Sequence, residues 1–267
     1  MDSNLFSSFA SLLRTITEAE LRAEIAEPKQ LLIDAAEVRG KKFQVAYAPF
    51  DYVNTAARIV IVGLTPGRQQ MENALVAAWR SLKKGDSEAE AMREAKVFAS
   101  FSGPMRNNLV AMLDSIGVNQ LLGIATAGSL WGVDAHLVHF TSVLRYPVFV
   151  DGKNYSGSPA PLAATLLQKH LMNWFASELA VLPNALFVPL GPVVNESVNA
   201  VALQAGLDHR RVLSGLPHPS GANAERIAFF LGRKLRENLS AKVNPEKLIA
   251  SRSSLMGKIS ALAIAAG

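Results

Sequence analysis

The sequence of 267 residues contains no cysteine. Disulfides, thiolate zinc sites, cysteine-ligated iron-sulfur clusters and a cysteine nucleophile are therefore excluded. The sequence also lacks an apolar run of the roughly 18 to 20 residues that a membrane helix needs. Its first 18 residues show no basic segment followed by the apolar core of a signal peptide. These absences predict a soluble, cytoplasmic protein.

What the sequence does contain is typical of a compact globular protein, since 49% of the residues are hydrophobic and 18% are charged. Internal repeats, low-complexity tracts and linkers rich in proline or glycine are missing, which predicts a single domain over residues 1–267. The net charge of +5 favours a polyanionic partner. By itself this signal is weak, because many basic proteins bind no nucleic acid.

Short apolar runs alternate with longer stretches of helical spacing. This order predicts an α/β fold with three layers, in which helices cover both faces of a central four-stranded parallel sheet. A helical extension at about residues 1–40 and a helical tail at about 241–267 are expected to pack on it. The expected strands are residues 58–63, 137–144, 185–190 and 211–216, and the expected helices are residues 69–82, 105–116, 160–179, 192–204 and 222–239.

Two turns between a strand and a helix carry the chemistry. Residues 63–68 read Gly-Leu-Thr-Pro-Gly-Arg, and the helix start that follows them would offer free amides to an anion. An ordinary turn explains this segment equally well. Residues 216–223 read Leu-Pro-His-Pro-Ser-Gly-Ala-Asn, in which two prolines would hold His218 in a fixed place. A lone histidine usually caps or packs, but ligands bind at this edge of an open sheet, which favours a functional role.

Together the two turns resemble the paired signature of the uracil-DNA glycosylase superfamily, a G-x-x-P-G loop and a later H-P-S loop. Asn223 and Arg226 continue the second match. Phe98 resembles the aromatic platform on which the family stacks a flipped base, Phe101 is the alternative, and core packing of either ring remains open. Ser142 stands where the family has an asparagine that reads the uracil edge. The similar segments run in the expected order from residue 58 to about residue 230.

The resemblance implies a uracil-DNA glycosylase-like fold and cleavage of the N-glycosidic bond of uracil or another damaged base flipped out of DNA, without metal or cofactor. His218 matches the donor that stabilises negative charge on the departing base. Thr65 stands at the position that places water, where its hydroxyl is a poor general base. Substrate contacts are then expected from Gly63, Leu64, Pro66, Gly67, Phe98, Phe101 and Ser142, and DNA contacts from Arg68, Ser102, Pro219, Ser220, Gly221, Asn223 and Arg226.

Departures from the family pattern leave three interpretations open. Thr65 replaces an aspartate or asparagine, Ser142 replaces an asparagine, and Ala222 stands where some members carry a larger wedge side chain. The first interpretation is a base-excision glycosylase whose partner is DNA. The second is a nucleic-acid-binding module that has lost turnover, and the third is an enzyme acting on free nucleosides. A monomer is expected in each case.

Overall fold

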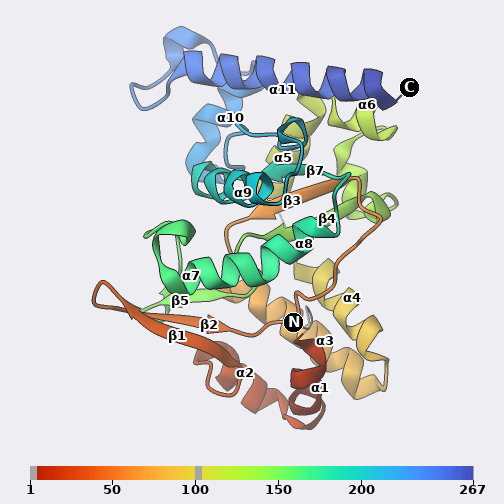
Figure 1. Cartoon of the computed structure of the whole chain (residues 1–267), viewed down its shortest axis with the longest axis vertical. Coiled ribbons are helices and arrows are strands. Elements are labelled where there is room, and N and C mark those ends of the chain that lie inside the picture. The colour runs from red at the N-terminus through yellow and green to blue at the C-terminus, as the bar shows by residue number, and fades with distance from the viewer. Residues whose placement is uncertain (1–4, 100–103, 267) are drawn as a thin grey trace. The chain divides into compact units, whose positions relative to one another are not determined.

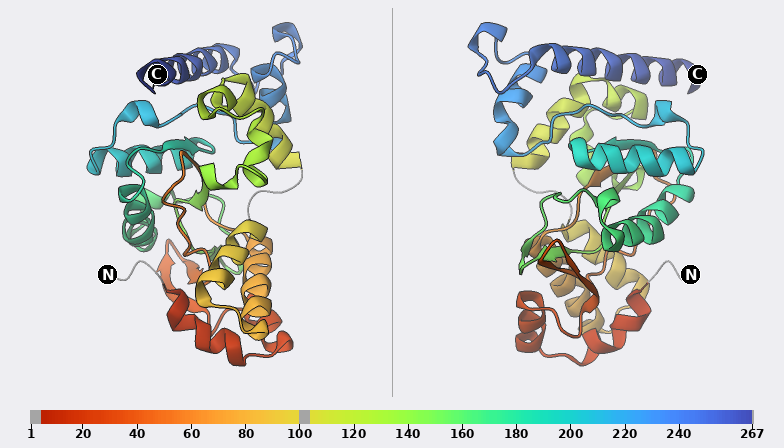
Figure 2. Two further views of the ribbon diagram at one scale, coloured as in Figure 1. Left: turned by 90° about the vertical axis from the view of Figure 1, so that its right-hand side faces the viewer. Right: turned by 60° about the vertical axis from the view of Figure 1, so that its left-hand side comes forward.

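The computed structural model describes residues 5–99 and 104–266 (Figures 1 and 2). The chain divides into two compact units, each built from three separate segments. The first unit contains Met1–Val53, Gly63–Ser100 and Phe140–Val181, and the second contains Asn54–Val62, Phe101–His139 and Leu182–Gly267. The single domain expected above stays a prediction.

An antiparallel sheet forms part of the first unit, with the order β1-β2-β5-β6. Its strands are β1 (Leu32–Val38), β2 (Lys41–Ala46), β5 (Val148–Val150) and β6 (Lys153–Asn154). Strands β1 and β2 form a hairpin whose turn places Arg39 and Gly40 at positive φ. The prediction of a helical extension over about residues 1–40 is therefore wrong at its end, where β1 is a strand. No residue of β1 is fully buried, and its sequence accordingly shows little of the apolar alternation that would predict a strand.

Helices complete the first unit. They are α1 (Phe6–Thr15), α2 (Glu18–Ala26), α3 (Arg68–Lys84), α4 (Glu88–Ala99), the 3-10 turn η3 (Pro161–Ala163), α7 (Thr165–His170), the π-helical turn η4 (Leu171–Phe175) and α8 (Ala176–Ala180). A capping box formed by Thr17 and Glu20 starts α2 and separates it from α1. Residues 160–179, predicted as one helix, are divided by η3 and η4. The prediction for residues 69–82 is confirmed by α3.

Three parallel strands in the order β4-β3-β7 begin in the second unit. They are β3 (Ile59–Gly63), β4 (Val138–Ser142) and β7 (Leu186–Pro189). Because four of the five β3 residues are fully buried, the strand needs the uninterrupted β-branched run that its sequence supplies. The predicted fourth strand at residues 211–216 is wrong. Only an isolated bridge joins Val212 to Phe187, and the chain turns at Gly215, whose φ is +112°.

Helices complete the second unit and are labelled in Figure 1. They are α5 (Pro104–Ser115), α6 (Val118–Leu122), α9 (Pro192–Gln204), α10 (Ala224–Phe230) and α11 (Pro245–Ala266), with the 3-10 turns η1 (Ala127–Trp131), η2 (Ala135–Leu137), η5 (His209–Arg211), η6 (Gly221–Asn223) and η7 (Arg236–Asn238). The predictions for α5, α9 and the tail helix are confirmed. The helix expected over residues 222–239 is shorter, because Gly232 at φ +72° follows its end. In the part of the chain that the structure describes, no helix is long and apolar enough to span a membrane.

Candidate functional site

The first predicted loop lies between the end of β3 and the start of α3. Its backbone is fixed beside the end of β4, because the amide of Val143 donates to the carbonyl of Gly63 at 2.9 Å and the amide of Leu144 donates to that of Leu64 at 3.0 Å. Ser142, the last residue of β4, directly precedes these bonds. The structure therefore brings the first loop and Ser142 together, two of the places where the resemblance implies substrate contacts.

The hydroxyl of Thr65 is engaged in the structure of this loop. It donates to the carbonyl oxygen of Tyr146 at 3.0 Å and accepts from the amide of Val148 at 3.1 Å. A hydroxyl has one proton and two lone pairs, so only one lone pair is left for a water. Thr65 thus fastens the loop to the start of β5, and its role in placing water stays a prediction.

Two of the amides at the start of α3, where the sequence predicts free amides, are already bonded. The amide of Gly67 donates to Oε1 of Gln70 at 2.9 Å, and the amide of Arg68 donates to Oδ1 of Asn154 at 3.0 Å. A Cβ atom on Gly67 would lie 3.1 Å from Nδ2 of Asn154. The glycine therefore allows β6 to approach and cap the helix, and an anion would have to displace these side chains.

The guanidinium of Arg68 is also occupied within the first unit. It donates to the carbonyl oxygens of Ile25, Ala26 and Gly152 and lies 4.2 Å from the ring centroid of Phe149. These contacts join α2, the start of α3, strand β5 and the turn between β5 and β6. The DNA contact expected of Arg68 stays a prediction, and the structure gives the side chain a packing role.

The aromatic platform falls at the edge of the described part of the chain. Phe98 lies in α4, within its last turn, and its side chain is outside the described residues. Phe101 and Ser102 lie outside them altogether. The choice between Phe98 and Phe101 therefore stays as the sequence left it.

The second predicted loop belongs to the second unit and holds His218 in one orientation. Nδ1 of His218 accepts the backbone N–H of Ser220 at 3.3 Å, and the ring packs against Gly191, where an added Cβ would lie 3.4 Å from its Cδ2 atom. The side-chain amide of Asn108, on α5, donates to the carbonyl of Pro219 at 2.9 Å. Because Nδ1 accepts, the proton of the neutral imidazole lies on Nε2. Burial lowers the pKa of His218, which favours this neutral form.

The residues after His218 form a short chain of hydrogen bonds. Asn223 donates through Nδ2 to Oγ of Ser220 at 3.3 Å, and its Oδ1 accepts from Nη1 of Arg226 at 3.1 Å. Nη2 of Arg226 donates to the carbonyl of Lys242 at 2.9 Å. The structure thus brings Ser220, Gly221, Asn223 and Arg226 together at η6 and the start of α10, which orders the loop without assigning any of them a DNA contact.

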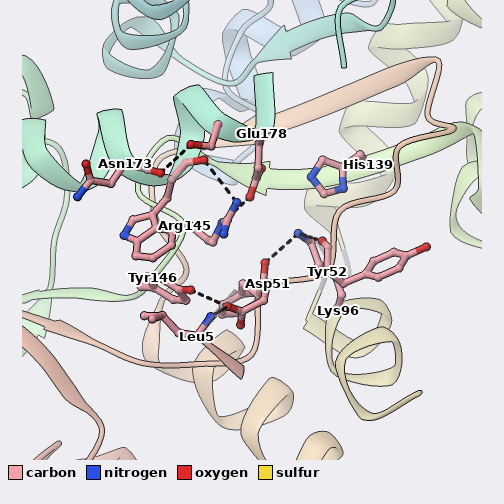
Figure 3. A network of polar contacts seen from close by, with 12 residues as sticks. Leu5, Asp51, Tyr52, Lys96, His139, Arg145, Tyr146, Asn173 and Glu178 are labelled. Atoms are coloured by element: carbon pink, nitrogen blue, oxygen red, sulfur yellow. Dashed lines mark hydrogen bonds and ion pairs between the residues drawn. The ribbon is translucent and has the colours of Figure 1, made fainter. Parts of the chain in front are cut away.

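A buried polar network in the first unit escaped the sequence analysis (Figure 3). Its centre is the carboxylate of Asp51, which accepts from the hydroxyls of Tyr47 at 3.0 Å and Tyr146 at 2.7 Å and from the amide of Leu5 at 2.8 Å. Asp51 is 6% exposed, and burial raises its pKa. Burial also raises the pKa of both tyrosines. Three donors to one buried carboxylate make this a firm anchor for the chain around residue 51.

Three further charged groups of the first unit are buried in the same region (Figure 3). Nε of Arg145 contacts Oε1 of Glu178 at 2.5 Å, and each side chain is 1% exposed. Nζ of Lys96 donates to the carbonyls of Phe50 and Tyr52 at 3.1 and 2.7 Å. Burial lowers the pKa of Lys96 to about 8. Sequence offered no signal for this network, because isolated charges far apart along the chain are usually solvent-exposed.

The predicted site residues divide between the two units. The first loop, Ser142 and the described backbone of Phe98 belong to the first unit, and the second loop with His218 belongs to the second. Within each unit, the structure supports a defined loop conformation. Asn154, which caps α3, and the buried network around Asp51 hold the first unit together and were not predicted from the sequence.

Comparison with known proteins gives one relative. No protein-family model matches the chain, and no solved structure matches it. The chain is 38% identical over 202 residues to "Uncharacterized protein YoxB" of Bacillus subtilis (strain 168), and the match covers 74% of this chain and 78% of that protein. Identity of this extent over most of both chains shows that this protein belongs to the same family as YoxB.

Proposed function

We propose that this protein is a DNA glycosylase with a uracil-DNA glycosylase-like fold, in which His218 supplies the hydrogen bond to the departing base. The observation that carries the proposal is the orientation of the imidazole. Its Nδ1 is taken by the amide of Ser220 at 3.3 Å, so Nε2–H is left as a neutral donor. The three parallel strands and the turn at the carboxyl end of β3 are consistent with such a fold.

The chemistry assigned to this donor is simple. When the N-glycosidic bond breaks, its electron pair goes to the base. Water adds to the sugar carbon, and the proton that this water loses is finally taken up by the released base. A fixed donor facing the base oxygen stabilises the charge as it develops, and it needs no reorganisation because the loop already holds the ring. Removing one such donor costs about 2.7–4 kcal/mol of transition-state stabilisation in enzymes of known mechanism.

The test is a cleavage assay on labelled oligonucleotides that each carry one uracil, hypoxanthine, xanthine or oxidised pyrimidine, followed by alkali to cut abasic sites. The wild-type protein is expected to cleave at least one lesion. His218→Ala is expected to slow this cleavage by about 10²- to 10³-fold. His209→Ala is the matched control, because His209 lies in the same unit with its side chain 87% exposed.

Cleavage of no lesion by excess wild-type protein would refute the glycosylase. Equal rates for wild type and His218→Ala would refute the assignment of the donor. A glycosylase whose rate falls equally in His218→Ala and His209→Ala would show that the loss is not specific to the second loop.

A second candidate is a nucleic-acid-binding module without turnover. The bonds of the Thr65 hydroxyl to Tyr146 and Val148 favour it, because they leave only one lone pair to accept from water at the position that the family pattern places beside the reacting water. Binding of lesion-containing oligonucleotides with no cleavage would establish this function. Cleavage of free nucleosides without DNA binding would exclude both candidates.

A further inference from the structure

The net positive charge of this protein comes from one of its two units. The first unit carries 15 Lys and Arg against 15 Asp and Glu, so it is neutral. The second unit carries 12 Lys and Arg against 7 Asp and Glu, and this excess equals the net charge of +5 of the whole chain. The unit that holds the His218 loop is therefore the one that attracts a polyanion.

A large open groove lies within this basic unit. It has a volume of about 840 Å³, and its walls come from α5, η1 and the turn that follows α10. Helix α5 contacts both η1 and α10. Ligand pockets in proteins commonly measure about 300–1,000 Å³, so the groove is large enough for part of a polymer chain.

Both cationic and apolar side chains line the groove. Arg106 and Arg233 supply the charge, and Asn107 adds an exposed amide. Val110, Ala111 and Leu231 line the same groove, and each is partly exposed to it. This combination matches a polymer with charged and apolar parts.

The two arginines differ in how they are held. The guanidinium of Arg106 lies 5.3 Å from the ring centroid of Trp131, a cation-π distance that fixes the direction of the side chain. Arg233 is exposed, and no hydrogen bond or ion pair of its guanidinium occurs among residues 5–99 and 104–266. One preset and one adaptable guanidinium suit phosphates spaced along a flexible strand.

One acid lies in the groove beside the two arginines. Asp114 accepts from the hydroxyl of Thr126 at 2.6 Å and from the amide of Ala127 at 2.7 Å. These bonds hold the carboxylate at the start of η1 and leave its negative charge in place. Arg106 and Arg233 against Asp114 give the lining of the groove a net charge of +1.

Helix α5 also joins the groove to the His218 loop. Asn107 lines the groove, and its neighbour Asn108 donates through Nδ2 to the carbonyl of Pro219 at 2.9 Å. A strand in the groove would thus lie against the same helix that positions the loop of His218. This places the groove and the proposed donor on one structural element of the second unit.

We propose that the groove along α5 binds single-stranded nucleic acid. The phosphates would contact Arg106 and Arg233, and unstacked nucleobases would pack on the apolar side chains of the groove. The inference rests on the proposed function, and it adds the strand preference. A duplex hides its bases in the stack and presents phosphates alone, so it would leave Val110, Ala111 and Leu231 without a partner. A single strand offers both, as in proteins that combine a basic groove with surfaces for bases.

The test measures fluorescence anisotropy of a labelled undamaged oligothymidylate with the full chain over a range of salt concentrations. Arg106→Ala with Arg233→Ala removes two phosphate contacts. The slope of log K against log salt is then expected to decrease in magnitude by about 1.4, or about 0.7 for each contact with a single strand. The wild type is expected to bind the single strand more tightly than the matching duplex.

Arg236→Ala with Lys247→Ala is the matched control. It removes the same charge from the second unit at residues outside the groove, and the wild-type slope is expected to persist. Ala111→Glu is a second test. Its carboxylate would lie among the apolar residues that line the groove and would repel phosphates, so binding should be abolished although both arginines remain. Thermal unfolding of each variant verifies that it is folded.

Several results would refute the proposal that the groove binds single-stranded nucleic acid. They are absence of wild-type binding, equal or tighter binding of the duplex, and an equal decrease of the salt slope in the two double variants. These readouts use undamaged strands and do not depend on cleavage. Failure to cleave the lesion panel would therefore refute the glycosylase and leave the proposed nucleic-acid groove intact. An unchanged salt slope in the arginine variant, with normal cleavage, would refute only the groove.

Discussion

His218 illustrates how one hydrogen bond at a residue sets a protonation state. With Nδ1 accepting from the amide of Ser220, a proton on Nδ1 would face an N–H group and break the bond. Because burial lowers the pKa of His218 from its ordinary value of 6.5, we expect cleavage to stay level above pH 6.5 and to fall only at lower pH. The measurement is the single-turnover cleavage rate between acid and neutral pH.

The His218→Ala variant is the control for this profile, because its residual rate should lack the same fall. A decline that already begins above pH 6.5, or that persists in His218→Ala, would contradict a neutral donor at this position.

The side-chain partners of Thr65 and Arg68 could not be predicted from the sequence. Both positions matched a chemical pattern, yet their side chains are bonded to Tyr146, Val148, Gly152 and the end of α2. Those partners lie some 40 to 85 residues away along the chain, and no local pattern announces them. For His218 one partner is local, because Ser220, whose amide donates to Nδ1, is two residues away, whereas Gly191 and Asn108 are distant in the sequence.

At the scale of elements, the cap of α3 is a property of β6. Asn154 accepts the amide of Arg68 at 3.0 Å and so satisfies a donor that the helix itself cannot. We expect Asn154→Ala to lower the free energy of unfolding by about 1 kcal/mol, a typical value for a lost cap. Urea denaturation measures this loss, and Lys153→Ala, an exposed neighbour on the same strand, should leave the midpoint unchanged.

If Asn154→Ala and Lys153→Ala have the same midpoint as the wild type, the amide at the start of α3 is satisfied by solvent. The helix start would then be open to an anion after all.

The elements themselves could be predicted where one physical signal dominated. Strand β3 is a continuous β-branched run, and α9 begins at a proline that the first turn of a helix accepts. The β1-β2 hairpin was missed because its polar and solvent-facing residues resemble an exposed helix. The strand expected near Val212 is reduced to a bridge because the chain leaves the sheet at Gly215, where a Cβ would lie 3.0 Å from Ser251.

At the scale of the whole molecule, the buried network connects all three segments of the first unit. Asp51 comes from the first segment, Lys96 from the second, and Arg145 with Glu178 from the third. We expect Glu178→Ala to lower the free energy of unfolding by about 3–5 kcal/mol, because it leaves a buried guanidinium without its carboxylate. Guanidinium chloride denaturation followed by circular dichroism measures the change.

Arg145→Met with Glu178→Leu is the informative control. Replacing both charges by apolar groups of similar volume removes the desolvation cost together with the attraction, so this variant should regain most of the lost stability. A double variant as unstable as Glu178→Ala would show that the pair organises the unit through its shape and its other contacts.

The alternation of segments between the two units has a consequence for synthesis on the ribosome. The first unit requires residues up to Val181, and the second requires the segment from Leu182 to the end of the chain. No nascent fragment that stops before residue 181 contains a complete unit. The early helices and the β1-β2 hairpin therefore stay partly unpacked until the later segments have been synthesised. During translation we expect chaperones that shield apolar surface to bind the nascent chain.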